Sequence, residues 1–504
     1  MWYVVQVAKL WLFSLFKRND TVYLISFFLE RGLKKLRLSE YELANIRKEK
    51  RFENYIPPER RIPLTKRAVY DGWQEKAEAA VRGEKGEARH DLEEQVAEYV
   101  DREYAVAVDS PAAALQMALK FCAAELYHSY SGISTPLGMG RGGCLYGKRV
   151  FCQDLMRPEM AAAIVQEGGE PVFIDNDGWT WNMDPETLER AFRIYPDVKI
   201  VVVSNTNGVP GSLKEIIELC AKNGAFLIED ASDALGSSYG NKKTGYVGTF
   251  SITGFREDGV LYGKGGLLLF DDYFFRHRLE EWVYQAGDVR DNHMNEELPY
   301  DYGMTDYTAA FLSSQFAHLD EEIGKRKVIY DRYKKMLDGS VLFLQEHGED
   351  GTPNYHRIAA RLDCNAIYYS AEIGPDGCVF EDVHGQTCPQ ELCTRLQAFG
   401  IEASRMMKPL HMMPIYRNHS FICAEGDARY NKESYGHMEI PADDGAAVYQ
   451  SSFCLPADTD MTEDEQKKIV DVIERCFYMR NRNYHVWEAE ELEHLMKNQI
   501  YEMA

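Results

Sequence analysis

Strand-like and helical patterns alternate along the first part of the chain. The strand-like runs Tyr104–Val108, Glu170–Ile174, Val198–Val203 and Ala225–Glu229 are each followed by a segment with helical periodicity. This alternation predicts an α/β fold, in which helices cover both faces of a doubly wound, mostly parallel sheet. Val198–Val203 is apolar apart from Lys199, as expected for a strand covered on both faces. Ligands of such sheets bind at the carboxyl ends of the strands.

The other predicted elements complete this layout. They are helices at Trp73–Val81, His90–Val100, Ala112–Leu126, Pro158–Glu167, Pro185–Tyr195 and Leu213–Asn223, and strands beginning at Val150 and at Phe250–Thr253 and Gly266–Phe270. Tyr307–Leu337 is predicted as one long helix that crosses to a smaller α+β domain. That domain is predicted to contain a strand at Asn365–Ser370 and helices at Gln390–Phe399 and Glu463–Phe477.

We therefore expect four regions: a basic, apolar N-terminal extension with a linker (1–60), a large domain (61–325), a small C-terminal domain (326–485) and a terminal helix (486–504). The linker is predicted over Leu38–Arg67, which is charged and carries three prolines. Tyr307–Leu337 joins the two domains in this scheme.

The N-terminal region differs from the rest of the chain in charge. The net charge is −23, yet residues 1–67 hold 15 Lys and Arg against 7 Asp and Glu. An acidic protein is a poor partner for nucleic acid. Residues 1–38 fit two amphipathic helices, Trp2–Phe16 being too short to span a bilayer. They could lie on an anionic membrane surface or, as we favour, pack on the body or a dimer partner. An initiation codon further downstream is a third possibility.

The cysteines predict a reduced protein of the cytoplasm. There are 11, and no two have the Cys-x-x-Cys spacing. Cys378, His384, Cys388 and Cys393 lie close together in sequence, but their spacings fit no standard zinc motif. We therefore predict no metal site and interpret these residues as small side chains in a strand and a helix.

Six longer segments together resemble the DegT-type (DegT/StrS) sugar aminotransferases, a branch of the fold-type I enzymes that use pyridoxal 5'-phosphate (PLP). They are residues 86–110, 168–191, 223–251, 302–333, 398–416 and 451–473, among them "NGAFLIEDASDALGSSYGNKKTGYVGTFS" and "AFGIEASRMMKPLHMMPIY". The resemblance implies a homodimer with active sites at the subunit interface. It also implies transfer of an amino group, typically from glutamate, to a keto-sugar nucleotide.

The resemblance assigns a cofactor role to several residues. Asp230 matches the aspartate that holds the pyridine nitrogen protonated, and Asp233 lies where a Gln or His commonly touches the ring. Ser251 matches a phosphate-binding serine. Ser110 and Ala112 fall in the segment where the family has Ser-Gly-Thr, so the threonine hydroxyl is missing at Ala112. Asp230 could equally be a turn or capping aspartate, and Ser251 an ordinary strand serine.

The catalytic lysine of the family is replaced. It stands five residues after the phosphate-binding serine, and that count reaches Arg256. A guanidinium stays protonated, so it can neither form an imine nor shuttle a proton. Lys264 is the one candidate substitute, because the loop before it is longer than in the family. His411, in a small-domain motif, is either a substrate contact or a structural hydrogen-bonding residue.

Three functions remain open at this point. The chain could be an active PLP-dependent aminotransferase that acts on a nucleotide-linked sugar for surface polysaccharide. It could be a non-catalytic homologue that serves as a regulatory or dimer-completing subunit. It could also be a membrane-surface scaffold for polysaccharide assembly, a hypothesis that rests only on the basic N-terminus.

Overall fold

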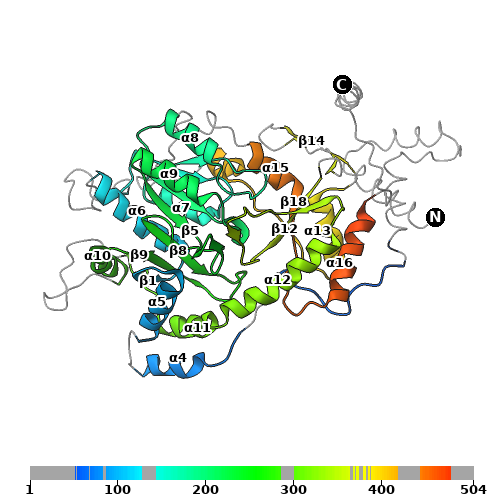
Figure 1. Ribbon diagram of the computed structural model, residues 1–504, viewed down its shortest axis with the longest axis horizontal. Helices are drawn as coiled ribbons and strands as arrows, with labels where there is room; N and C mark the ends of the chain where they lie inside the picture. Colours follow the sequence, from blue (N-terminus) through cyan, green and yellow to red (C-terminus); the bar gives the residue numbers. More distant parts are fainter. Residues whose placement is uncertain are drawn as a thin grey trace, which may run out of the picture. The chain divides into compact units, whose positions relative to one another are not determined.

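The structure is a computed structural model that describes residues 52, 54–66, 69–82, 87–127, 143–284, 300–363, 367–368, 371–373, 379–381, 384–385, 387–417 and 443–477. The chain divides into two compact units, Met1–Tyr55 and Ile56–Ala504. The second unit contains two main sheets (Figure 1). The predicted helices within 1–38 and 486–504 lie outside the described residues.

The larger sheet has seven strands, and all but one run in the same direction. Their spatial order is β1 (Tyr104–Val108), β9 (Gly265–Phe270), β8 (Phe250–Phe255), β5 (Phe226–Asp230), β4 (Ile200–Ser204), β2 (Arg149–Gln153) and β3 (Glu170–Ile174). The exception is β9, which is antiparallel to both of its neighbours. The predicted α/β class with a mostly parallel sheet is confirmed.

Helices cover both faces of this sheet, so each strand buries both sets of alternating side chains. One face packs on α6 (Pro111–Tyr127), α7 (Pro158–Gln166) and α10 (Tyr273–Val283). The other packs on α5 (Glu87–Val100), α8 (Pro185–Ile194), α9 (Leu213–Asn223) and α11 (Asp306–Phe316), with α4 (Trp73–Val81) lying against α11. Within β5, Ile228 faces the first layer and Leu227 the second, so Asp230 belongs to the face of Ile228.

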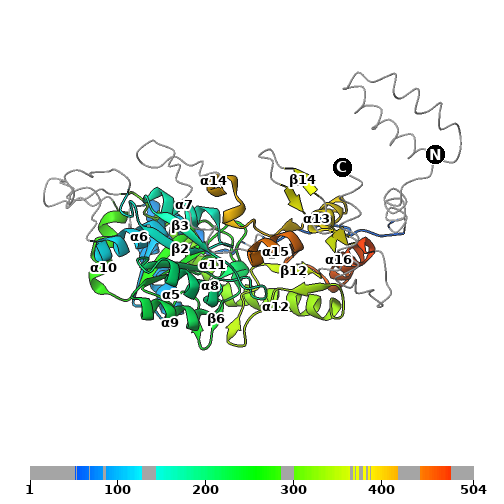
Figure 2. The ribbon, with the colours of Figure 1, turned by 90° about the horizontal axis from the view of Figure 1, so that it is seen from above.

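The second sheet has four strands in the order β10 (Leu342–Leu344), β12 (Ile358–Leu362), β18 (Ser452–Leu455) and β17 (Ser404–Arg405). It packs with α13 (Pro389–Ala398) and α15 (Asp443–Ser451), while α16 (Glu463–Cys476) lies against α12 (Leu319–Met336) and α13 (Figure 2). Small two- and three-stranded pairings involve β6 (Ser238–Tyr239), β7 (Lys242–Lys243), β11 (Gly351–Thr352), β13 (Ile367–Tyr368), β14 (Ala371–Ile373), β15 (Val379–Glu381) and β16 (His384–Gly385). No helix in the described part of the chain is long and apolar enough to cross a membrane.

The single helix predicted over Tyr307–Leu337 is wrong, because the chain forms two helices there. α11 ends at Phe316, and α12 begins at Leu319. His318 leaves the helical conformation (φ −105°, ψ 8°), and its ring stacks on Tyr70 at a centroid distance of 3.8 Å. Helical periodicity alone does not reveal this contact, because Tyr70 is distant from His318 in sequence. The predicted division at 325/326 falls within α12.

The segment Ile56–Lys66, predicted as part of a linker, is docked against the C-terminal part of the chain. Ile62 is fully buried, and its backbone pairs with Gly400 and Glu402 at 2.9 and 2.8 Å. Arg60 bonds to Asp458 and Glu465. We call Ile56–Lys66 the strap.

Two of the four residues weighed as zinc ligands have structural roles. The Cys388 thiol caps the start of α13 by accepting a hydrogen bond from Glu391 N at 3.4 Å, and Cys393 is buried in the same helix. Cys378 and the side chain of His384 lie outside the described residues.

Candidate active site

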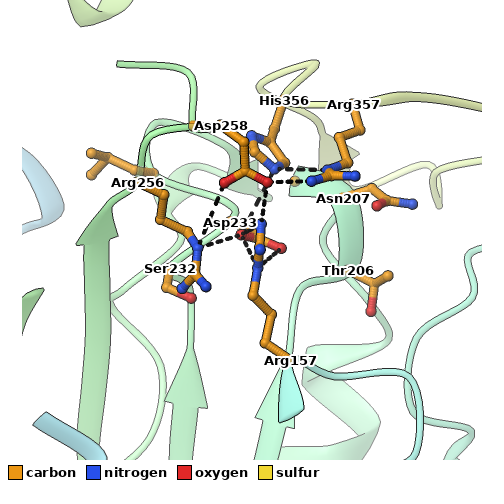
Figure 3. Close-up of polar contacts among 12 residues, drawn as sticks. Arg157, Thr206, Asn207, Ser232, Asp233, Arg256, Asp258, His356 and Arg357 are labelled. Atoms are coloured by element: carbon orange, nitrogen blue, oxygen red, sulfur yellow. Dashed lines mark hydrogen bonds and ion pairs between the residues drawn. The ribbon is translucent and has the colours of Figure 1, made fainter. Parts of the chain in front are cut away.

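Polar side chains gather where the parallel strands β2, β5 and β8 end. β5 ends at Asp230, with Asp233 three residues later, and Arg256 directly follows β8. Arg157 follows β2 before α7. Because parallel strands present their carboxyl ends at one edge, these residues of distant sequence meet there. Figure 3 shows the resulting cluster.

Asp230, to which the resemblance assigns the contact with the pyridine nitrogen, ends β5. Its side chain is buried, and it accepts hydrogen bonds from Ser204 Oγ (3.0 Å) and Ser232 N (3.1 Å). Burial raises the pKa of this carboxyl, the nearby charge of Asp233 adds to the rise, and the serine hydrogen bonds oppose it. The carboxylate is therefore satisfied by groups of the chain itself.

Ser251 lies on the other side of the sheet. It pairs with Glu229 across β5 and β8, whereas Asp230 pairs with Ile252, and residues paired in a ladder share a face. The Ser251 hydroxyl donates to Gly245 O and accepts from Arg102 at 3.3 Å. The structure therefore does not bring Ser251 together with Asp230, and its phosphate-binding role stays a prediction.

Ser110 is the N-cap of α6. Its Oγ accepts a hydrogen bond from Ala113 N at 3.2 Å and donates one to Asp109 at 3.2 Å. Pro111 occupies the first helical position, where a missing N–H costs nothing. Ala112 is partly buried in the first turn. The segment thus has a complete structural explanation as a helix start, and its role toward a phosphate stays a prediction.

Arg256 is held by three carboxylates. It bonds to Glu159 of α7, and its Nε lies 4.0 Å from Asp233 Oδ1 and 3.9 Å from Asp258 Oδ1. Only 15% of its side chain is exposed. A guanidinium in this setting remains protonated and serves as a fixed positive charge.

Asp233 is the centre of the cluster. Its carboxylate contacts Arg157 with Nε–oxygen distances of 3.0 and 3.1 Å, and it lies 3.7 Å from His356 Nε2. Burial by itself would raise the pKa of Asp233, but the charge of Arg157, followed by those of His356 and Arg256, holds the pKa well below its usual range. Its arginine partners therefore favour the ionised form of this buried aspartate.

Lys264 and His411 flank the same edge of the sheet, because Phe255 at the end of β8 pairs with Gly265 at the start of β9, and Asp154, the partner of His411, directly follows β2. Lys264 is exposed, directly before β9. His411 bonds through Nδ1 to Asp154 at 2.6 Å, and its backbone N donates to the same carboxylate at 2.9 Å. Asp154 is fully buried. These bonds are compatible with a structural histidine, and a contact of His411 with a substrate stays a prediction.

Four residues of the cluster were missed from the sequence: Arg157, Asp258, His356 and Arg357. Asp258 bonds to Arg357 and lies 3.3 Å from Arg157. Burial would raise the pKa of Asp258, but Arg157, His356 and Arg357 lower it to about 2. Burial lowers the pKa of His356 to about 3, so this imidazole is neutral. The one signal in the sequence that pointed to this cluster was the high density of charged residues in "MRPE" (Met156–Glu159) and "FRED" (Phe255–Asp258).

The sheet order and the aspartate at the end of β5 define the class: this is the fold of a PLP-dependent aminotransferase. The family model of the DegT/DnrJ/EryC1/StrS aminotransferases matches residues 74–374, and the chain belongs to this family.

Its relatives include EpsN of Bacillus subtilis strain 168, assigned as a pyridoxal phosphate-dependent aminotransferase, with 29% identity over 77% of this chain and 87% of EpsN. The GDP-perosamine synthase of Escherichia coli O157:H7 is 28% identical over 54% of this chain and 69% of its own length. Among solved structures, an aminotransferase of this family from Brucella abortus has a TM-score of 0.62 at 22% identity, covering 80% of this chain and 95% of its own.

PLP is the cofactor of this family, but the residues present here do not fit its covalent attachment. Among the described residues, the cations that contact Asp233 and Asp258 are arginines, and the neutral His356 lies beside Asp233. Arg256, at the position where the resemblance expects the lysine, is engaged by Glu159, and Asp230 is buried with donors of its own.

Proposed function

We propose that this chain is a non-catalytic member of the sugar aminotransferase family, a regulatory or dimer-completing subunit in the synthesis of surface polysaccharide. The observation that carries the proposal is Arg256, a permanently charged residue at the lysine position, held by Glu159, Asp233 and Asp258. Imine formation needs an uncharged primary amine at a fixed position. The names of two relatives, GDP-perosamine synthase and a spore coat polysaccharide biosynthesis protein, support the polysaccharide context.

The changes around Arg256 point the same way. Arg157 and Asp233 form a buried ion pair, and opposite charges in such a setting cannot be separated without a large loss of stability. Arg256 therefore belongs to a network of charges rather than being an isolated replacement. Its partner is either a second copy of the chain or an active homologue, as the dimers of the family imply.

The second candidate is an active aminotransferase that takes a nucleotide sugar and glutamate. It is favoured by family membership and by Asp230, which stands at the end of β5 where the cofactor aspartate is expected. This function requires another lysine, of which Lys264 is the sequence candidate.

Absorption spectroscopy, followed by borohydride reduction and peptide mapping, distinguishes the two functions. Purified protein is mixed with PLP, reduced with borohydride and digested, and the peptides are searched for a lysine-linked cofactor. We expect the same colourless product, free of linked cofactor, from the wild type and from the variant Lys264→Met. A borohydride-stable adduct on any lysine of the wild type, lost in a single Lys→Met variant, would restore the active enzyme.

Membrane contact of residues 1–38 is a separate proposal, compatible with a protein of the cytoplasm. It is tested by flotation with vesicles that contain phosphatidylserine, comparing the full chain with residues 56–504. Flotation of the full chain alone supports surface contact, and equal behaviour of both removes it.

A further inference from the structure

The segment Asn354–Arg357, which leads into β12 of the smaller sheet, is inserted at the carboxyl edge of the larger sheet. The fully buried Asn354 donates from Nδ2 to the carbonyl oxygens of Asp233 and Leu235, both at 3.0 Å. A side chain at Gly208 would meet Asn354 Oδ1 at 1.9 Å, so the fit is tight. Tyr355 has a φ of 56°, a left-handed conformation that a tyrosine adopts only when its surroundings impose it.

Charges close the same junction. Asp258, in the loop after β8, contacts Arg157 from the larger sheet and Arg357 from the segment before β12. Arg357 Nε also donates to His356 Nε2 at 3.4 Å, and this nitrogen lies 3.7 Å from Asp233. Asp258 is thus the carboxylate through which the two sheets share ion pairs (Figure 3).

A third tie comes from α12. Arg326 is fully buried and donates to His356 O at 3.2 Å, to Gly259 O at 3.3 Å and to Thr65 Oγ1 at 2.8 Å. One guanidinium therefore joins the inserted segment, the loop that carries Asp258, and the strap. Two of these acceptors are backbone carbonyls, which fix the path of the chain.

We infer that these contacts form a built-in lock, which holds the smaller sheet closed on the edge of the larger one without any ligand. We define the lock as Arg157, Asp233, Asp258, His356 and Arg357 with Arg326. In this arrangement the charges of the chain itself supply the attraction across the junction. The lock does not depend on whether the chain catalyses, because none of its contacts involves a lysine or a cofactor.

Hydrogen exchange of the full-length protein, without PLP, tests the lock. We expect Asp258→Asn to speed exchange in peptides that cover residues 354–362 by about tenfold or more, because local opening becomes easier. The matched control is Glu189→Gln, which removes one negative charge from the exposed pair between Glu189 and Lys222 and leaves exchange in 354–362 unchanged. Unchanged protection of 354–362 in Asp258→Asn overturns the lock.

Substitutions at Arg357 provide an independent test if Asp258→Asn does not fold. Arg357→Lys keeps a positive charge beside Asp258, while Arg357→Gln does not. We expect Arg357→Lys to retain most of the protection and Arg357→Gln to lose it. Equal loss in both variants, or none in either, contradicts an electrostatic lock. These results leave the borohydride experiment untouched, so failure of the lock and failure of the proposed function are distinguishable.

Discussion

Glu229, in β5 on the face opposite to Asp230, is a single residue that makes the stability of the fold depend on pH. It is fully buried and accepts hydrogen bonds from Asn205 Nδ2 (2.8 Å), Gly245 N (3.0 Å) and Val247 N (2.9 Å). Burial raises the pKa of Glu229 to about 7, although these donors and the charge of Arg102 lower it. A carboxyl with a raised pKa stabilises the fold while it is protonated.

The sign of the effect follows from this pKa. The contribution of Glu229 is fully present below its unfolded pKa of about 4.3 and is lost as the pH rises through about 7. We expect the unfolding free energy of the wild type to fall by on the order of 3 kcal/mol more over this range than that of Glu229→Gln. Urea unfolding from pH 4.5 to 8 measures the difference. The exposed Glu218→Gln is the control, and parallel curves for all three proteins would contradict the prediction.

The sequence reached some of these residues and missed others for physical reasons. Asp230 and Arg256 were reached through the resemblance, Asp230 directly after a predicted strand and Arg256 five residues after Ser251, and their roles stay predictions. The face occupied by Ser251 depends on the register between β5 and β8, and a sequence does not state a register. Asp258 and Arg357 lie 99 positions apart, so their pairing is a property of the folded chain alone.

At the level of helices and strands, local sequence patterns predicted the bounds of an element where nearby residues, such as a C-cap glycine, end it. The bounds of α4, α9, β1 and β3 agree with the prediction, and Gly224 ends α9 in the left-handed conformation expected of a C-cap. Prediction failed between α11 and α12, because their helical periodicity is continuous and the break comes from His318 stacking on Tyr70.

Substitutions of Ser110, at the start of α6, test whether this residue caps the helix. Ser110→Ala should lower the unfolding free energy by about 1 kcal/mol, because Ala113 N loses its acceptor. Ser110→Asp should keep the stability, since a carboxylate accepts the same hydrogen bond and lies favourably at a helix N-terminus. Chemical denaturation of the three proteins measures this. Equal losses in both variants would show that capping is not the role of Ser110.

The chain as a whole divides into two compact units, Met1–Tyr55 and Ile56–Ala504. We expect a protein of residues 56–504 to fold alone, with a melting temperature within about 2 °C of that of the full chain, because a compact unit with its own core is stable without its extension. Scanning calorimetry makes the comparison. A larger drop, or a collapse of the cooperative transition, would show that the extension contributes to the fold.

The strap has a consequence for biosynthesis. Arg60 and Glu465 are 405 positions apart, yet they are bonded to each other in the finished unit. Ribosomes add roughly 5–20 residues per second, so the strap leaves the ribosome tens of seconds before α16 exists to receive it. During most of that interval Ile62, which is fully buried in the finished unit, also lacks its backbone partners Gly400 and Glu402. The contacts between the strap and the C-terminal part of the chain can therefore be completed only at the last stage of translation.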